Sequence, residues 1–262
     1  MTVLDIRDLS LSIGSTPILK NVSLSVAPGE ILGLVGESGS GKSMTSLAVL
    51  GLTPPRATMS GEIRLNGQVV SNAPDAVMQQ VRGRDVGIIF QEPMTALNPV
   101  MTIGDQVAET VRLHKKASRK EALAVARAVL DRVGLPAERF PLTRYPHELS
   151  GGQRQRVAIA IAIALTPKLL IADEATTALD VTTQAQVLDL LKRLVREDGM
   201  GLILITHDLA VVAETADRMA VMKDGELVEE APVDRIRTGM AHPYSRRLLA
   251  NATHAPVRRS RP

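Results

Sequence analysis

The order of apolar and polar positions divides the chain into a β-rich beginning, a helical middle and a second β-rich part. Short alternating runs at 3–6, 9–13 and 22–26, interrupted by glycine and proline, predict strands. The continuous apolar run Ile31-Leu32-Gly33-Leu34-Val35 predicts a strand that is buried on both faces. Three later runs predict strands of the same kind: 86–90, 169–172 and 202–205.

Helix and hairpin signals fill the intervals between these runs. Ser118, with Glu121 three residues later, has the pattern of a capping box, and Gly134 follows the last apolar position of that helix. Asn66-Gly67 and Asp224-Gly225 follow short apolar runs and predict two β-hairpins. Further helices are predicted at 44–50, 153–165 and 184–197.

These elements predict a single α/β domain with an insertion. We expect residues 92–152 to form a helical subdomain, inserted into an α/β core made by 1–91 and 153–240. Residues 241–262 are expected to form a short tail. No internal repeat or low-complexity tract interrupts this organisation.

Composition narrows the class of protein. The 262 residues are 45% hydrophobic and 23% charged, as is usual for a globular protein, and the absence of cysteine excludes disulfides and iron–sulfur clusters. The longest uninterrupted apolar run, 157–165, has about half the length of a membrane span. The beginning lacks the charged-then-apolar pattern of a signal peptide. We therefore expect a cytosolic or peripheral protein.

The net charge is +3, and the basic residues are spread along the chain except at its end, where they gather. A basic tail there is either a solvated terminus or a segment that attracts anionic lipid or nucleic acid. An aromatic content of 2%, with no tryptophan, disfavours a base-stacking surface, so no nucleic-acid partner is expected. The arginines of this tail are Arg246, Arg247, Arg258, Arg259 and Arg261.

A phosphate loop follows the strand predicted at 31–35. The sequence Gly-Glu-Ser-Gly-Ser-Gly-Lys-Ser fits G-x-x-x-x-G-K-[ST] in full, between a strand and a helix. Backbone N–H groups of such a loop surround phosphate, Lys42 neutralises its β and γ oxygens, and Ser43 binds Mg²⁺. The predicted ligands are ATP and Mg²⁺. The predicted binding residues are Gly36, Glu37, Ser38, Gly39, Ser40, Gly41, Lys42, Ser43 and Met44.

Polar residues follow three of the predicted buried strands, at the sheet edge where parallel strands bind ligands. Asp173 is placed to hold Mg²⁺, and Glu174 is placed to polarise the attacking water. His207 is placed to contact the γ-phosphate, and Gln91 to reach Mg²⁺ or the water. Structural alternatives are solvated loop charges for the carboxylates, a structural histidine, and a capping role for Gln91.

A second glycine-rich segment, Leu149-Ser150-Gly151-Gly152-Gln153, lies more than a hundred residues after the phosphate loop. Ser150 to Gln153 open a predicted helix and present backbone N–H groups to an anion. This segment is too distant along the chain to belong to the same loop. We interpret it as closing over a nucleotide held by another chain, so the working unit is a dimer. Asp180, in Ala178-Leu179-Asp180, is placed to make contacts across that dimer.

In this order and spacing, the motifs resemble the nucleotide-binding subunit of ATP-binding cassette (ABC) transporters over essentially the whole chain. The resemblance implies a RecA-like P-loop NTPase core with an antiparallel β subdomain and an inserted helical subdomain. It also implies a head-to-tail dimer that encloses two ATP–Mg²⁺ and drives a membrane permease. The implied roles are phosphate and Mg²⁺ binding for Lys42 and Ser43, general base for Glu174, switch for His207, and contact with the other chain's γ-phosphate for Ser150 to Gln153.

Three segments resemble the dipeptide, oligopeptide and nickel importer subfamily: Phe90 to Pro99, Leu179 to Gln184, and His242 to Leu249. This resemblance implies a peripheral subunit on the cytoplasmic face of a bacterial plasma membrane. Its implied partners are a second, different ATPase subunit, two permease chains and, indirectly, an extracytoplasmic binding protein. A homodimer stays open, because both halves of a site are present. The expected cargo is a peptide, with nickel or another metal chelate as the alternative.

Three features depart from the subfamily. Ile13 stands where an adenine-stacking aromatic is expected, so a purely apolar contact with adenine is predicted. Ala175 replaces a usual proline. Many peptide-type members extend further, with cysteines for an iron–sulfur cluster, whereas this chain ends soon after Leu249 and has no cysteine. We therefore expect similarity to shorter members, which include nickel and metal-chelate importers as well as peptide importers.

Two other classes of function compete with transport. An ABC ATPase of DNA repair or of ribosome work would carry a coiled-coil insert or a second cassette, whereas this chain has one phosphate loop. A non-transport scaffold or assembly ATPase stays open, although Glu174 favours hydrolysis. If the chain serves a transporter, we expect the permease to dock in a groove beside Gln91 and residues 92–105.

Overall fold

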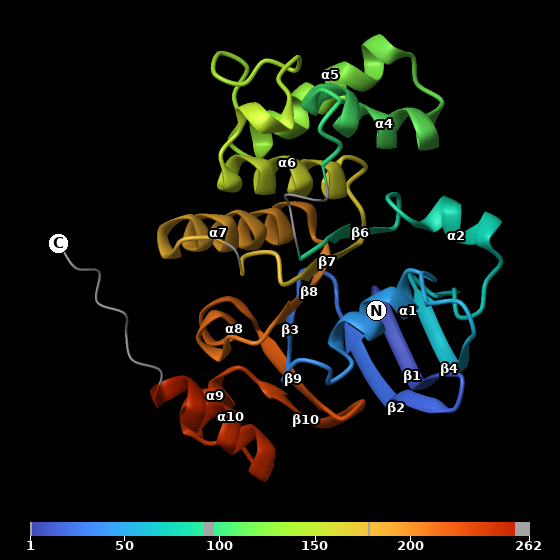
Figure 1. The fold of residues 1–262 in the computed structure, drawn as a ribbon, viewed down its shortest axis with the longest axis vertical. Helices are drawn as coiled ribbons and strands as arrows, with labels where there is room; N and C mark the ends of the chain where they lie inside the picture. Colours follow the sequence, from blue (N-terminus) through green and yellow to red (C-terminus); the bar gives the residue numbers. More distant parts are fainter. Residues whose placement is uncertain (1, 92–96, 178, 255–262) are drawn as a thin grey trace.

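The computed structural model describes residues 2–91, 97–177 and 179–254, and its strands form two sheets (Figure 1). Several sequence predictions lie outside the described residues: those on 92–96, on Ala178, and on the tail arginines Arg258, Arg259 and Arg261. Among the helices that are described, none is long and apolar enough to cross a membrane.

The larger sheet has six strands in the order β10-β9-β3-β8-β7-β6. The five strands from β9 to β6 are parallel, and β10 pairs antiparallel with β9. The four strands predicted to be buried are all present. The bounds are β3 Ile31–Val35, β6 Val86–Ile89, β7 Leu169–Asp173, β8 Gly201–Thr206, β9 Arg218–Lys223 and β10 Glu226–Pro232.

One end of a predicted strand is wrong. The run at 86–90 was expected to be buried throughout, but β6 ends at Ile89 and Phe90 is 46% exposed. The last ladder pair joins Ile89 to Ala172, so Phe90 lies beyond the sheet and has no strand beside it. Because Phe90 is apolar, the sequence pattern predicted a strand one residue longer than β6.

Alternate residues of the large sheet enter two separate hydrophobic cores. In β3, Leu32 and Leu34 belong to one core, and Ile31 and Val35 belong to the other. The first core also contains the smaller sheet and helix α1 (Lys42–Val49). The second contains buried residues of α6 (Gly151–Ile163), α7 (Val181–Asp198) and α8 (Leu209–Thr215). Burial on both faces explains why these strands are continuously apolar.

The smaller sheet is antiparallel, in the order β2-β1-β4-β5. The two runs predicted at 3–6 and 9–13 form one strand, because Asp8 takes a φ of 49° at an irregularity where the register shifts, and the pairing with β2 and β4 resumes beyond it. Both predicted hairpins are confirmed: Asn66-Gly67 joins β4 to β5, and Asp224-Gly225 joins β9 to β10, each with two positive φ angles. The bounds are β1 Leu4–Ile13, β2 Thr16–Val26, β4 Ala57–Leu65 and β5 Gln68–Val69.

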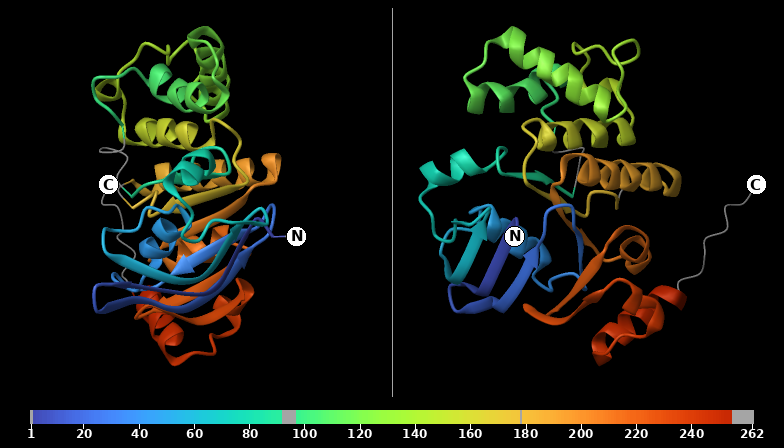
Figure 2. Two further views of the ribbon diagram at one scale, coloured as in Figure 1. Left: turned by 90° about the vertical axis from the view of Figure 1, so that its right-hand side faces the viewer. Right: turned by 180° about the vertical axis from the view of Figure 1, so that it is seen from behind.

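Helices α4 (Ile103–Lys115) and α5 (Arg119–Arg132) pack on α6 (Figure 1). The predicted capping box of Ser118 and Glu121 is present at the start of α5. Both views of Figure 2 place α4 and α5 at the opposite end of the molecule from the last helices. The remaining helices are α2 Asp75–Val81, the 3₁₀ turn η1 Pro146–Glu148, α9 Asp234–Thr238 and α10 Pro243–His254.

Helix α6 is the element that connects the helical region to the sheet, because it contacts α4, α5 and β6. Gly87 of β6 makes this approach close: a Cβ there would overlap the carbonyl oxygen of Ala162. Any side chain at this position must therefore separate the helix from the strand.

We predict that Gly87→Ala lowers the free energy of unfolding by about 1–3 kcal/mol, because its methyl group overpacks the contact with α6. Urea denaturation measures this. Gly151→Ala, at the start of the same helix with open space around its Cβ position, serves as the control and should be neutral or stabilising. A Gly87→Ala protein as stable as the wild type would contradict the packing argument.

Candidate nucleotide-binding site

The phosphate loop connects β3 to α1 and is closely packed against the end of β9. A Cβ at Gly36 would overlap the backbone oxygen of Met222, so only glycine fits there. Gly41 has a φ of 104° immediately before the first residue of α1. The loop is thus fixed between the sheet and a helix N-terminus, the arrangement in which backbone N–H groups bind an anion.

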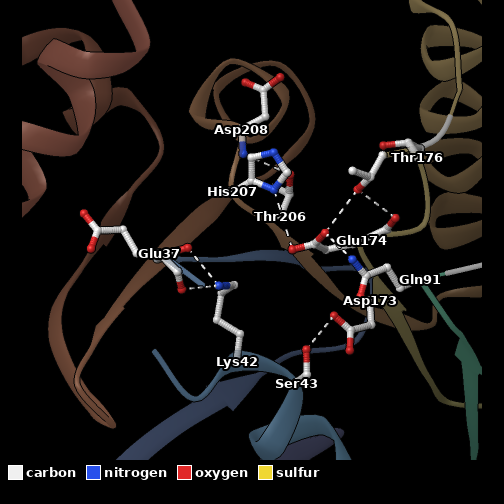
Figure 3. Close-up of polar contacts among 12 residues, drawn as sticks. Glu37, Lys42, Ser43, Gln91, Asp173, Glu174, Thr176, Thr206, His207 and Asp208 are labelled. Atoms are coloured by element: carbon white, nitrogen blue, oxygen red, sulfur yellow. Dashed lines mark hydrogen bonds and ion pairs between the residues drawn. The ribbon is translucent and has the colours of Figure 1, made fainter. Parts of the chain in front are cut away.

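Lys42 is buried within this loop (Figure 3). Its ammonium group donates to the carbonyl oxygens of Gly36 and Glu37, both at 2.8 Å, and to Ser40 Oγ at 3.4 Å. Burial lowers the pKa of Lys42, and the carboxylates of Glu174 and Asp173 oppose that shift. Because the contact with Ser40 is the longest, it is the one that a phosphate oxygen can most readily replace.

Ser43 and Asp173 lie side by side beneath Lys42. The Ser43 hydroxyl donates to Asp173 Oδ1 at 3.1 Å, and Asp173 is the last residue of β7. Burial raises the pKa of Asp173; Ser43 and Lys42 oppose this effect, and the negative charge of Glu174 adds to it. A hydroxyl and a buried carboxylate in contact fit Mg²⁺, which prefers oxygen ligands.

Glu174 begins the turn after β7 with a φ of 47°, and its N–H donates to the Ile205 carbonyl of β8 at 3.0 Å. Its side chain meets two predicted partners. Gln91 Nε2 donates to Oε2 at 2.8 Å, and His207 Nδ1 lies 3.5 Å from Oε1. Figure 3 shows these three side chains converging from the ends of different strands.

Thr177 is a further contact of Glu174 that the sequence analysis did not identify. Its hydroxyl donates to the Glu174 carbonyl at 3.0 Å and lies 3.3 Å from Oε2. The signal was a threonine three residues after a strand-end carboxylate, in a position to close a turn. Thr177 and Gln91 together hold one carboxylate oxygen and leave the other toward His207.

A pocket of about 360 Å³ lies over the loop. Its lining residues are Ile18, Ser38, Gly39, Gly41, Lys42, Ser43, Met44, Gln91 and Glu174. The predicted adenine contact, Ile13, is half-buried at the end of β1 and pairs with Thr16; the lining includes Ile18 of β2 instead. The step from β1 into β2 brings Ile18, rather than Ile13, beside the loop.

The second glycine-rich segment lies elsewhere in the molecule. Ser150 caps α6, with its Oγ accepting from Gln153 N–H at 3.4 Å and Gln153 Oε1 accepting from Ser150 N–H at 2.9 Å. Asp180 caps α7 by accepting from Thr183 N–H at 3.0 Å. Ser150, Gly152, Gln153 and Thr183 line a separate pocket of about 450 Å³ that shares no lining residue with the first. One chain thus does not bring the two glycine-rich segments together.

Since burial raises the pKa of Asp173, its ionisation destabilises the folded chain, and the proton is held more tightly when folded than when unfolded. We predict that Asp173→Asn raises the midpoint of thermal unfolding near neutral pH without nucleotide. This gain should shrink as the pH falls through the raised pKa, and vanish below the ordinary value of 3.8. Scanning calorimetry across pH measures it.

The matched control for this prediction is Asp189→Asn, which removes an exposed carboxylate on α7. It should leave the midpoint nearly unchanged at every pH, because exposed ion pairs contribute little. An Asp173→Asn protein less stable than the wild type near neutral pH would contradict the burial argument.

The chain is similar in sequence to known proteins. The glutathione import ATP-binding protein GsiA of Salmonella choleraesuis is 54% identical over 239 residues, which are 88% of this chain and 38% of that protein. A Brucella melitensis protein named as a peptide import ATP-binding protein is 51% identical to this chain over 238 residues. These residues are 88% of this chain and 70% of that protein. The chain thus spans well under half the length of GsiA.

A solved structure gives the same result for the fold. The dimeric ATP-binding cassette MJ0796, in a post-hydrolysis state with ADP and Pi, superposes with a TM-score of 0.76 at 32% identity. The match covers 88% of this chain and 98% of that chain. The predicted P-loop ABC fold is confirmed. Since the family model described as ABC transporter matches residues 19–177, the chain belongs to the ABC transporter family.

Proposed function

We propose that this chain binds and hydrolyses ATP with Mg²⁺ and that this hydrolysis powers peptide import across the cytoplasmic membrane of a bacterium. The observation that carries the proposal is the convergence of Glu174, Gln91 and His207 on the pocket above Lys42 and Ser43. The names of the two import relatives support a peptide as cargo. Nickel or another metal chelate remains the alternative cargo.

In the proposed site, Lys42 binds β- and γ-phosphate oxygens while its two bonds to loop carbonyls keep it in place. Ser43 and Asp173 would hold Mg²⁺, with Gln91 as a further oxygen ligand, and the ion would supply positive charge near the transferring phosphoryl group. Glu174 accepts the proton of the attacking water. Since Gln91 and Thr177 hold Oε2, that proton goes to Oε1, beside His207, which contacts the γ-phosphate.

We further propose a head-to-tail dimer in which residues 150–153 of one chain contact the γ-phosphate on the other, and Asp180 lies at the interface. The dimeric state of MJ0796 supports this arrangement. A homologous but different chain is the favoured partner, and a second copy of this chain would also provide both halves. Within each chain, 1–91 and 153–240 act as the core, 92–152 as the helical subdomain and 241–262 as the tail.

The other proposed partners are two permease chains and, through them, an extracytoplasmic binding protein, which places this subunit at the cytoplasmic face of the membrane. A groove of about 270 Å³ at the start of α4 is the proposed permease contact. Val100 and Tyr145 both line this groove and are 80% and 38% exposed. Glu109 and Arg112 line the same groove with opposite charges. No nucleic-acid partner is proposed.

We predict that Glu174→Gln retains ATP binding and forms a stable ATP-dependent dimer, while turnover falls about 100-fold or more, because an amide cannot accept the proton of water. Phosphate release and size-exclusion chromatography with ATP measure the two properties. Glu214→Gln, an exposed carboxylate on α8, is the matched control and should hydrolyse ATP normally. Near-wild-type turnover of Glu174→Gln would refute the general-base role.

We predict that Glu109→Lys lowers peptide uptake on the order of tenfold and leaves basal ATPase activity unchanged, because a reversed charge in the groove opposes docking. Uptake of a labelled dipeptide and of a nickel chelate in reconstituted vesicles measures transport and separates the two cargoes. Affinity purification of the tagged chain from solubilised native membranes measures docking.

The wild-type chain and the control Glu214→Lys should recover two multi-span permeases and a second ATPase, and Glu109→Lys should recover less of them. Uptake by Glu109→Lys equal to that of the control would refute this docking surface. If the wild-type chain recovers only soluble proteins, a scaffold or assembly function is favoured over transport.

A further inference from the structure

Helix α10 contacts the phosphate loop directly, although the two lie at opposite ends of the sequence. The hydroxyl of Tyr244 accepts a hydrogen bond from the backbone N–H of Glu37 at 3.2 Å. Tyr244 is only 4% exposed, so this bond is shielded from water. The roles proposed for the nucleotide site leave this contact unexplained, because Tyr244 is not among the residues that line the pocket.

The peptide group that joins Gly36 to Glu37 is held at both ends. Its N–H donates to Tyr244, and its carbonyl oxygen, that of Gly36, accepts from Lys42 Nζ at 2.8 Å. Because a peptide group is planar, its N–H and its C=O cannot turn independently. The hydroxyl of Tyr244 therefore fixes the direction of the carbonyl that holds the lysine ammonium.

Tyr244 is itself held by groups outside the phosphate loop. The ammonium of Lys223, at the end of β9, lies 5.5 Å from the centre of its ring. The backbone N–H of Tyr244 donates to His242 Nδ1 at 3.2 Å. The carboxylate of Glu229 on β10 accepts from the N–H groups of Ala241 and His242, at 2.7 and 3.1 Å. The tyrosine is thus anchored to the β9–β10 edge and can position the loop.

We propose that Tyr244 is a positioning residue for Lys42 and, through it, for the phosphates of the nucleotide. A lysine has three donors, and here two of them go to the carbonyls of Gly36 and Glu37, so the direction of these carbonyls determines where the third points. Without the hydroxyl, the Gly36–Glu37 peptide can turn and the ammonium loses its fixed place. This inference rests on the phosphate-binding role proposed for Lys42.

The test uses the two tyrosines of the chain, which has no tryptophan. Tyr244→Phe retains the ring and removes the hydroxyl; Tyr145→Phe makes the same change at the other tyrosine and is the matched control. Calorimetric titration of the full chain without Mg²⁺ should give a Kd for ATP and for ADP that is about 3- to 10-fold higher in Tyr244→Phe. The Kd should be unchanged in Tyr145→Phe.

A purely structural role would lower the fraction of active protein and the thermal midpoint, whereas the Kd and KM of the folded molecules would stay constant. A Tyr244→Phe protein whose Kd lies within a factor of about 1.5 of the wild-type value would overturn the proposal, and so would an equal shift in Tyr145→Phe.

Lys42→Ala separates this inference from the role on which it rests. If Lys42→Ala binds ATP as tightly as the wild type, the phosphate-binding role is wrong, and this inference is wrong with it. If Lys42→Ala loses affinity while Tyr244→Phe does not, only the positioning role is wrong.

A second measurement does not require Tyr244→Phe to fold. In Tyr145→Phe, Tyr244 is the single tyrosine, and its emission reports the environment of its hydroxyl. ATP or ADP should change that emission, because the Gly36–Glu37 peptide adjusts when Lys42 takes up a phosphate, whereas adenosine should not. Constant emission at saturating ATP would overturn the proposal.

Discussion

The site depends on the interactions that allow the Lys42 ammonium to be buried. A buried cation is costly unless hydrogen bonds and opposite charges compensate it. Here the carbonyls of Gly36 and Glu37 provide the hydrogen bonds, and the carboxylates of Asp173 and Glu174 provide the charge. The compensation is mutual but incomplete, since the pKa of Asp173 is raised and that of Lys42 is lowered. A phosphate anion would stabilise the charged form of Lys42, and a metal cation would stabilise the ionised form of Asp173. The pocket is therefore suited to both ions together.

Close contacts between backbone segments hold these charged groups in place. Gly36 lets the loop lie against Met222 of β9, and Gly87 lets α6 lie against β6, where in each case a Cβ would overlap a backbone oxygen. The loop, the carboxylates and His207 all follow the carboxyl ends of neighbouring parallel strands. The sheet thus brings polar side chains that are distant in the sequence into contact, such as Ser43 with Asp173 at 3.1 Å and His207 with Glu174 at 3.5 Å. Stability and catalytic geometry therefore depend on the same contacts.

Features with a local cause were predictable from the sequence. The Asn66-Gly67 hairpin, the Ser118 capping box and the doubly buried strand at 31–35 each depend on a few adjacent residues, and the structure has all three. The strand-end rule likewise predicted that Gln91, Glu174 and His207 lie at one edge of the sheet, and the structure adds that Gln91 and His207 both contact Glu174. Tertiary packing decided the rest. Ile18 and Tyr244 reach the loop from β2 and α10, and no pattern in their own segments indicates that contact.

The separation of the two glycine-rich segments supports the proposed dimer on physical grounds. The pocket beside residues 150–153 is lined by Arg139 and Arg156 and by none of the carboxylates of the first pocket, so its charge is positive. Burial lowers the pKa of Arg156, and neighbouring Arg193 adds to this effect, so a negative group would stabilise the arginine's charge. One pocket holds the groups to which we assign hydrolysis in our proposal, and the other holds a helix N-terminus with arginines beside it. A nucleotide that contacts both must lie between two chains, which makes ATP itself the link that joins them.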